Sequence, residues 1–146
     1  LNFTSLWVLC DFAVASRQEG YMDSSDGVNF VENDARKYIN DKGLVTRDRK
    51  TKKDVFYLYK ALWNKHQPTV YIAGCRRRKP DIGSEIAIKA YSNARSLTLY
   101  QNGIKQQSMK GSGEATGVVW KFDSVKAQTA HDVFKVVSEN GVVCTW

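Results

Sequence analysis

In the second half of the chain, apolar and polar residues alternate in short runs. A period of two residues is typical of strands that bury one face. The alternation predicts strands over residues 69–73, 85–91, 96–101, 118–122, 133–138 and 142–146. Six or seven short strands at spacings of about ten residues predict a mainly β fold, an immunoglobulin-like β-sandwich.

Two turn signals support this prediction. Asn-Gly at residues 102–103 follows a predicted strand and is the strongest short hairpin signal. Glu-Asn-Gly at residues 139–141 separates the last two predicted strands and indicates a second hairpin. The sandwich prediction rests on the strand count and on these two hairpins.

The first part of the chain follows a different pattern. A short apolar run at residues 6–10 predicts a buried strand, and a polar stretch from about residue 16 to 38 predicts a long loop. Residues 51–64 predict a helix, because apolar side chains recur there at helical spacing. These side chains are Val55, Leu58, Tyr59 and Leu62. Pro68 then ends the helical pattern.

The composition is that of a globular protein. Of the 146 residues, 42% are hydrophobic and 25% are charged, which excludes a disordered chain. Three cysteines are too few for a disulfide scaffold, and no apolar run reaches the roughly 18–20 residues of a membrane span. Because the chain begins and ends within apolar runs, we expect an excerpt of a longer protein, with two parts at residues 1–67 and 68–146.

The cysteines and histidines show no metal-binding motif. Cys10, Cys75 and Cys144 are far apart in the sequence, and His66 and His131 stand alone, whereas metal sites commonly use closely spaced ligands. We therefore expect neither a metal nor a cofactor. Whether Cys75 and Cys144 pair is left open by the sequence.

The charge balance raises the question of a nucleic-acid partner. Lys and Arg total 22 against 15 acidic residues, which gives a net charge of +7, and basic runs lie at residues 47–53 and 76–79. Such runs can contact phosphates, or they can form a solvent-exposed surface. No helix-turn-helix, zinc-finger or RNA-binding aromatic motif accompanies them, so we expect no nucleic acid among the partners.

Three side chains are candidates for binding a polar ligand. Asn40 and Lys42 lie two residues apart before Gly43, and an amide and an ammonium at this spacing can converge on a hydroxyl or a carboxylate. A plain turn is the alternative interpretation. Trp7 lies near the end of the first apolar run, where an indole either stacks on a sugar or packs in a core.

Three stretches of the first part resemble the end of the catalytic barrel in glycoside hydrolase family 2. They are residues 6–13 (LWVLCDFA), 17–20 (RQEG) and 39–63 (INDKGLVTRDRKTKKDVFYLYKALW). The family includes β-galactosidases, β-glucuronidases and β-mannosidases. Residues 89–93 (KAYSN) and 96–103 (SLTLYQNG) resemble a hairpin of the immunoglobulin-like domain that follows the barrel in that family.

The resemblance implies roles for the candidate residues. Residues 3–10 would be the eighth strand of a (β/α)8 barrel, and the helix near residues 51–63 would be its eighth helix. Active sites of such barrels lie at the C-terminal ends of the strands. Trp7 would line the sugar subsite, and Asn40 and Lys42 match an Asn-x-Lys pair that contacts the sugar carboxylate in β-glucuronidases. Related galactosidases carry the same string, so the pair leaves the sugar open.

The resemblance also implies that catalysis lies elsewhere. Retaining glycosidases use two carboxylates about 5–5.5 Å apart, and in this family both are glutamates of earlier barrel strands. Five glutamates of this chain match neither motif: Glu19, Glu32, Glu85, Glu114 and Glu139. We expect the chain to be the C-terminal part of a retaining exo-β-glycosidase. It would be a β-galactosidase, with a β-glucuronidase as the alternative, and the chain alone would be inactive.

A last strand and helix cannot bury their apolar faces without the rest of a barrel. We therefore expect residues 68–146 to form the folded core, the helix to pack on it or to mediate self-association, and residues 14–40 to be mobile. The expected partners are a β-linked carbohydrate, the rest of the barrel and a second copy in a homo-oligomer, with no membrane. The resemblance implies a periplasmic or secreted protein.

A rival interpretation makes the sandwich a carbohydrate-binding or interaction module. Tyr91, Tyr100 and Trp120 would then form its platform. The strand pattern places Trp120 on one face with Val118 and Phe122, which favours a core position for the indole. Exposed aromatic side chains in a row would support the module, and buried ones would support a structural domain.

Overall fold

The computed structural model describes residues 6–13, 39–40, 42–74, 80–113 and 115–146. The chain divides into two compact units, Leu1–Lys53 and Asp54–Trp146. Helix α1 (Asp54–Trp63) therefore belongs to the same unit as the sandwich. The domain division between residues 67 and 68 stays a prediction.

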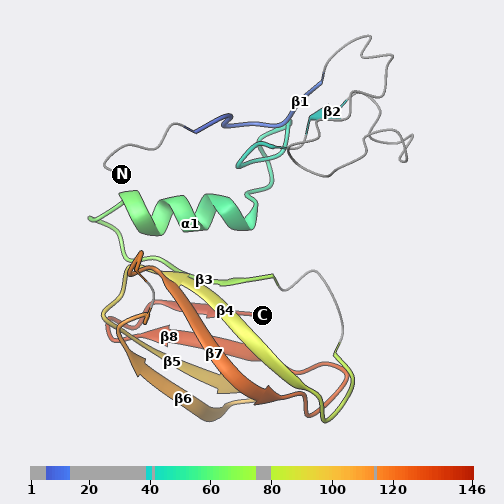
Figure 1. Cartoon of the computed structure of the whole chain (residues 1–146), viewed down its shortest axis with the longest axis vertical. Coiled ribbons are helices and arrows are strands. Elements are labelled where there is room, and N and C mark those ends of the chain that lie inside the picture. Colours follow the sequence, from blue (N-terminus) through green and yellow to red (C-terminus); the bar gives the residue numbers. More distant parts are fainter. Residues whose placement is uncertain (1–5, 14–38, 41, 75–79, 114) are drawn as a thin grey trace. The chain divides into compact units, whose positions relative to one another are not determined.

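The second unit is an antiparallel β-sandwich. A three-stranded sheet has the order β3-β4-β7, and a four-stranded sheet has the order β6-β5-β8-β9 (Figure 1). All strand pairs within these two sheets are antiparallel. The strands are β3 (Val70–Ala73), β4 (Glu85–Ser92), β5 (Ser96–Gln101), β6 (Ile104–Lys110), β7 (Val119–Lys126), β8 (Phe134–Ser138) and β9 (Val143–Thr145). The sandwich predicted from the alternating pattern is confirmed.

The core lies between the two sheets, where alternate side chains of each strand meet. Trp120 and Phe122 of β7 and Leu99 of β5 are 0% exposed. The indole Nε1–H of Trp120 donates to the carbonyl oxygen of Ser92 over 3.0 Å. Trp120 is therefore a core residue, and the rival interpretation that uses it in a sugar-binding platform is wrong on this point.

Both predicted hairpins are present. Asn102 and Gly103 have φ angles of 52° and 81°, and two successive positive values are the signature of the type I′ turn that joins strands most tightly. β5 and β6 pair on either side of that turn. Gly141, with φ of 75°, donates its N–H to the Ser138 carbonyl over 3.0 Å in the turn between β8 and β9.

Helix α1 begins at Asp54, three residues later than predicted. Residues before it close a tight turn instead: the Thr46 N–H donates to the Thr51 carbonyl over 2.9 Å, and the Thr51 N–H donates to Thr46 Oγ1 over 3.1 Å. Lys52 forms a β-bridge with Val45. These bonds hold the backbone in extended and turn conformations, so the helix cannot start at residue 51 despite its helical side-chain spacing.

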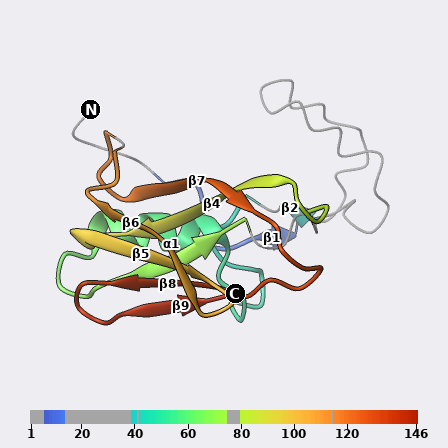
Figure 2. The same ribbon diagram turned by 90° about the horizontal axis from the view of Figure 1, so that it is seen from below.

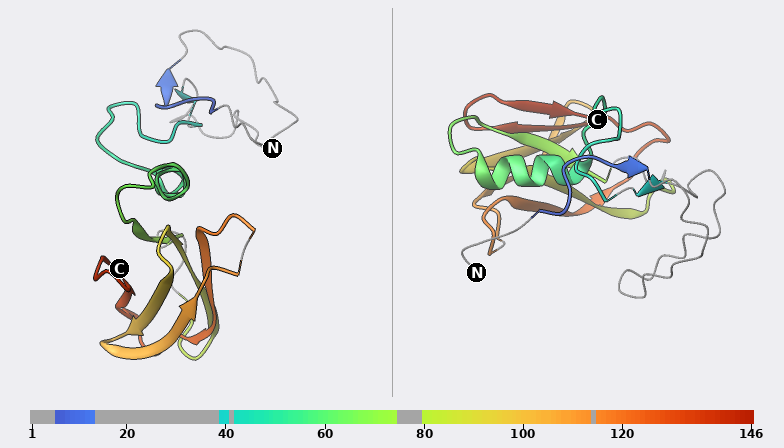
Figure 3. Two further views of the ribbon diagram at one scale, coloured as in Figure 1. Left: turned by 90° about the vertical axis from the view of Figure 1, so that its left-hand side faces the viewer. Right: turned by 90° about the horizontal axis from the view of Figure 1, so that it is seen from above.

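Helix α1 packs on the three-stranded sheet, as predicted. The ring of Tyr57 stacks on Tyr71 of β3 with centroids 3.8 Å apart. The Asp54 carboxylate accepts hydrogen bonds from the Tyr71 hydroxyl over 2.6 Å and from the Gly74 N–H over 2.7 Å. Figures 2 and 3 show that the helix lies outside the sandwich, on the side away from β5 and β6. In the described parts of the chain, no helix is long and apolar enough to cross a membrane.

The first unit contains little regular structure among its described residues. β1 (Phe12–Ala13) and β2 (Ile39–Asn40) form a short antiparallel pair. The buried strand predicted over residues 6–10 is wrong: Leu9 is exposed, and a single bridge joins Cys10 to Val45. In the described part of this segment, the backbone forms hydrogen bonds with residues 44–45, and two residues are too few for a continuous pair of strands. The loop predicted over 16–38 lies outside the described residues, as does nearly all of the segment 14–40 expected to be mobile.

One carboxylate ties the connection after β7 to the β5–β6 turn. Asp132 accepts hydrogen bonds from Gln101 Nε2 over 2.8 Å, Asn102 Nδ2 over 2.9 Å, the Gln128 N–H over 2.7 Å and both the N–H and hydroxyl of Thr129. Partial burial raises the pKa of Asp132, but the hydrogen bonds outweigh it and lower the pKa to about 2.

We expect Asp132→Asn to lower the free energy of unfolding of the chain and to make that free energy depend less on pH under acidic conditions. A depressed carboxyl pKa contributes stability above the unfolded pKa of about 3.9, and this contribution disappears as the pH falls through the folded value. The free energy of unfolding of the unmodified chain should exceed that of the variant by about 1–3 kcal/mol at pH 7. The difference should shrink between pH 4 and pH 2.

Urea unfolding of the 146-residue chain across this pH range measures the difference. Asp123→Asn is the matched control, because Asp123 pairs with Lys121 on the exposed surface and such pairs contribute less than about 1 kcal/mol. A constant difference between pH 7 and pH 2 would contradict the role of the Asp132 carboxylate.

Candidate functional site

The segments that carry the three candidate residues pair with one another in the first unit. The Leu9 carbonyl, two residues after Trp7, accepts the N–H groups of Leu44 and Val45 over 2.9 and 3.1 Å. The backbone of Asn40 pairs with that of Phe12. Trp7 is 75% exposed and its peptide bond to Val8 is cis. Lys42 is also exposed.

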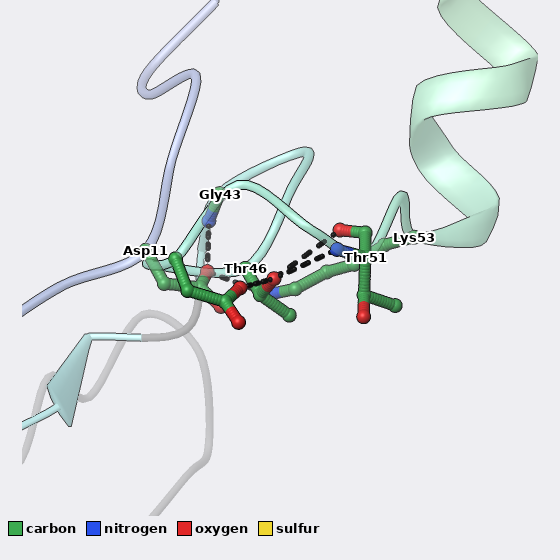
Figure 4. Close-up of polar contacts among 6 residues, drawn as sticks. Asp11, Gly43, Thr46, Thr51 and Lys53 are labelled. Carbon is green, nitrogen blue, oxygen red and sulfur yellow. Dashed lines mark hydrogen bonds and ion pairs between the residues drawn. The ribbon is translucent and has the colours of Figure 1, made fainter.

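Asp11 lies at the centre of this arrangement (Figure 4). Its Oδ1 atom accepts the Gly43 N–H over 2.9 Å and an ion-paired hydrogen bond from Lys53 Nζ over 2.6 Å. The residue is only 8% exposed, and a carboxylate so deep in protein needs donors and an opposite charge. Sequence analysis missed this residue as a site component, because its partners are 32 and 42 positions away.

Gly43 is required by close approach and not by its φ angle. A Cβ atom at this position would overlap the backbone of Cys10 and Asp11. Glycine therefore lets the turn that carries Lys42 lie directly against the strand-like segment after Trp7. The glycine in the Asn-Asp-Lys-Gly string has a packing role that the turn interpretation alone did not include.

Asp11 also borders a shallow open depression. Its lining consists of Asp11, Thr46, Arg47, Asp48 and Thr51. The Thr46 hydroxyl and the Lys50 N–H donate to the Asp48 carboxylate over 2.5 and 3.1 Å and hold its pKa below the usual range. The basic run at residues 47–53 is mostly exposed, and Lys53 within it forms the ion pair with Asp11.

The described glutamates and cysteines show no arrangement for catalysis or metal binding. Glu139 accepts the backbone N–H groups of Arg95 and Ser96, both over 2.9 Å, and these bonds hold its pKa below the usual range. Cys144 is a free thiol whose sulfur accepts the Ile72 N–H over 3.4 Å. Among the residues that the structure describes, no group of His, Cys, Asp and Glu could hold a metal ion.

Comparison with known proteins identifies the relatives of this chain, although no family model matches it. A β-glucuronidase of Bacteroides fragilis is 37% identical over 137 residues, which is 92% of this chain and 17% of that protein. An FMN-binding β-glucuronidase from Facaelibacterium prausnitzii L2-6 is 37% identical, with a TM-score of 0.70 over 95% of this chain and 18% of that structure. The chain is a homologue of one segment of these glycosidases.

Further solved structures agree with this relationship. A Bacteroides fragilis protein assigned as a β-galactosidase is 28% identical, with a TM-score of 0.66 over 96% of this chain and 19% of its own. A Parabacteroides merdae β-glucuronidase at 23% identity and a TM-score of 0.67 supports the fold alone. The resemblance to glycosidases of the β-glucuronidase and β-galactosidase type is thus confirmed. This chain spans less than a fifth of the length of these glycosidases.

Proposed function

We propose that this chain is the C-terminal part of a retaining exo-β-glycosidase of family 2, and that the enzyme is a β-glucuronidase. The observation that carries the proposal is the 37% identity of nearly the whole chain to two β-glucuronidases. The cationic side chain of Lys42, exposed and two residues from Asn40, supports the choice of sugar. A glucuronide carries a carboxylate at physiological pH, and a galactoside carries none.

Each candidate residue has a distinct role in the proposed site. The exposed indole of Trp7 offers an apolar face to the C–H groups of a sugar ring. The Lys42 ammonium donates a charge-assisted hydrogen bond to the sugar carboxylate. The amide of Asn40 supplies a donor and an acceptor for the carboxylate or a neighbouring hydroxyl.

Bond cleavage requires a nucleophile and an acid/base from other parts of the enzyme. A retaining glycosidase forms a glycosyl-enzyme intermediate on one carboxylate while the other protonates the leaving oxygen. Neither role falls to Glu139, which caps the backbone at the start of β5. In this proposal the chain contributes recognition of the sugar, and the reacting groups come from other parts of the enzyme.

A β-galactosidase is the second candidate. The 28% identical Bacteroides fragilis structure favours it, and the Asn-x-Lys pair is compatible with a hydroxyl in place of a carboxylate. In that case Lys42 would make a neutral-acceptor hydrogen bond, which is weaker than one to an ionised group.

Hydrolysis of p-nitrophenyl β-glucuronide, β-galactoside and β-mannoside by the full-length protein that contains this chain decides between the sugars. We expect the highest kcat/KM for the glucuronide. Preference for the galactoside would support the second candidate, and no hydrolysis of any of the three would reject the glycosidase proposal.

The sandwich serves in this proposal as a structural accessory domain. Its aromatic side chain Trp120 is buried, which supports that role over sugar binding. Val55 and Trp63 of α1 are exposed apolar residues that fit contact with the rest of the catalytic barrel or with a second copy. We also propose export to the periplasm or the medium. Fractionation of cells that express the full-length protein tests this location.

A further inference from the structure

The turn that carries Lys42 is fixed to the segment after Trp7 by two kinds of contact. Backbone hydrogen bonds join the Asp11 N–H to the Val45 carbonyl over 3.0 Å and the Leu44 N–H to the Leu9 carbonyl over 2.9 Å. The side chain of Asp11 adds the bond to the Gly43 N–H. Gly43 follows Lys42 directly, so any shift of its amide moves the Lys42 backbone too.

The Asp11 carboxylate accepts the hydrogen bond of the Gly43 amide over 2.9 Å. The same oxygen binds Lys53, which in turn donates its backbone N–H to the Leu44 carbonyl over 2.9 Å. The nearly buried carboxylate of Asp11 therefore holds Gly43 directly and Leu44 through Lys53. Because a charged acceptor forms stronger hydrogen bonds than a neutral one, its loss affects all of these links.

We propose that Asp11 is a positioning residue for sugar recognition: its carboxylate holds the Gly43 amide and the Lys53 ammonium, and so fixes the backbone from which Lys42 reaches the substrate. The inference rests on the proposed function for the identity of the substrate. It adds a residue that does not touch the sugar but determines where a sugar-binding side chain lies. Displacement of a positioned group by about 1 Å can reduce a rate about 100-fold.

A double-mutant cycle separates positioning from general destabilisation. In the full-length enzyme, Asp11→Ala should lower kcat/KM for p-nitrophenyl β-glucuronide about 10-fold when Lys42 is present. It should lower kcat/KM less than about two-fold in the Lys42→Ala background, because the side chain to be positioned is then absent. Equal losses in both backgrounds would overturn the proposal, since a purely structural role acts in each alike.

Asp11→Asn is the second variant, for the case in which Asp11→Ala does not fold. Asparagine retains an oxygen that can accept the Gly43 N–H, so its expected loss is about 3-fold with Lys42 present and none with Lys42→Ala. Asp123→Asn, which alters an exposed ion pair in the sandwich, should leave kcat/KM unchanged. If neither Asp11 variant folds, Asp11 is a folding residue and the proposal is overturned.

Amide exchange on the 146-residue chain tests the contact without any substrate. The Gly43 amide should exchange about 10-fold faster in Asp11→Asn than in the unmodified chain, because its acceptor is weakened. The Ser92 amide, which donates to the Val118 carbonyl in the sandwich, should not change. An unchanged Gly43 rate would overturn the proposal. A faster rate in a protein whose full-length form does not hydrolyse glucuronides would support the positioning contact and reject only the sugar.

Discussion

Lys42→Ala in the full-length enzyme should lower kcat/KM for p-nitrophenyl β-glucuronide about 100-fold. A hydrogen bond to a charged group contributes about 1.5–3 kcal/mol, and a factor of ten in rate corresponds to about 1.4 kcal/mol. The same change should alter kcat/KM for the β-galactoside by less than about 3-fold, because that sugar has no carboxylate for the ammonium to bind. The ratio of the two kcat/KM values is the quantity to measure.

Lys105→Ala is the matched control for this experiment. Lys105 is an exposed lysine on β6 of the sandwich, so its removal changes the net charge by the same amount without touching the proposed site. Its ratio of glucuronide to galactoside activity should equal that of the unmodified enzyme. An equal loss on both sugars in Lys42→Ala would mean that Lys42 does not recognise the carboxylate.

Trp120→Ala should destabilise the sandwich by about 3–5 kcal/mol. The indole is fully buried among the side chains of both sheets, and its Nε1–H bonds to the Ser92 carbonyl. Alanine would leave a large cavity and a buried carbonyl without this donor. Small domains have total stabilities of about 5–15 kcal/mol, so the urea midpoint of the 146-residue chain should fall by a large fraction.

Trp63→Ala provides the comparison for the same substitution at an exposed position. Trp63 at the end of α1 is 56% exposed and its ring packs beside that of Tyr59. Its removal should cost less than about 1.5 kcal/mol, the contribution of an aromatic pair. Similar losses for the two variants, measured by circular dichroism during urea unfolding, would contradict the placement of Trp120 in the core.

The sandwich was predictable because its signals are local. The Asn102-Gly103 turn needs only two positive φ angles, and glycine and asparagine adopt them readily. The alternation that places Trp120 and Phe122 on one face is a property of the five consecutive residues 118–122. Tertiary contacts then reinforce what the neighbouring residues already favour.

The first unit was less predictable because its contacts are not local. Asp11 bonds to Gly43 and Lys53 across 32 and 42 positions, and no pattern of neighbouring residues indicates such partners. Helix α1 begins later than predicted for a related reason. Hydrogen bonds between Thr46 and Thr51 fix a turn before the helix, and the helical spacing of side chains alone does not reveal that turn. For Trp7, Asn40 and Lys42, the resemblance suggested the roles, and the structure pairs the backbones of the segments that carry them.

The central claim is that this chain contributes sugar recognition while catalysis resides in other parts of the enzyme. Hydrolysis of p-nitrophenyl β-glucuronide by the full-length protein and by the 146-residue chain, at equal molar concentration, tests it most directly. We predict turnover by the full-length protein and none by the 146-residue chain. Turnover by the 146-residue chain would contradict the claim, because both reacting carboxylates would then lie within its own sequence.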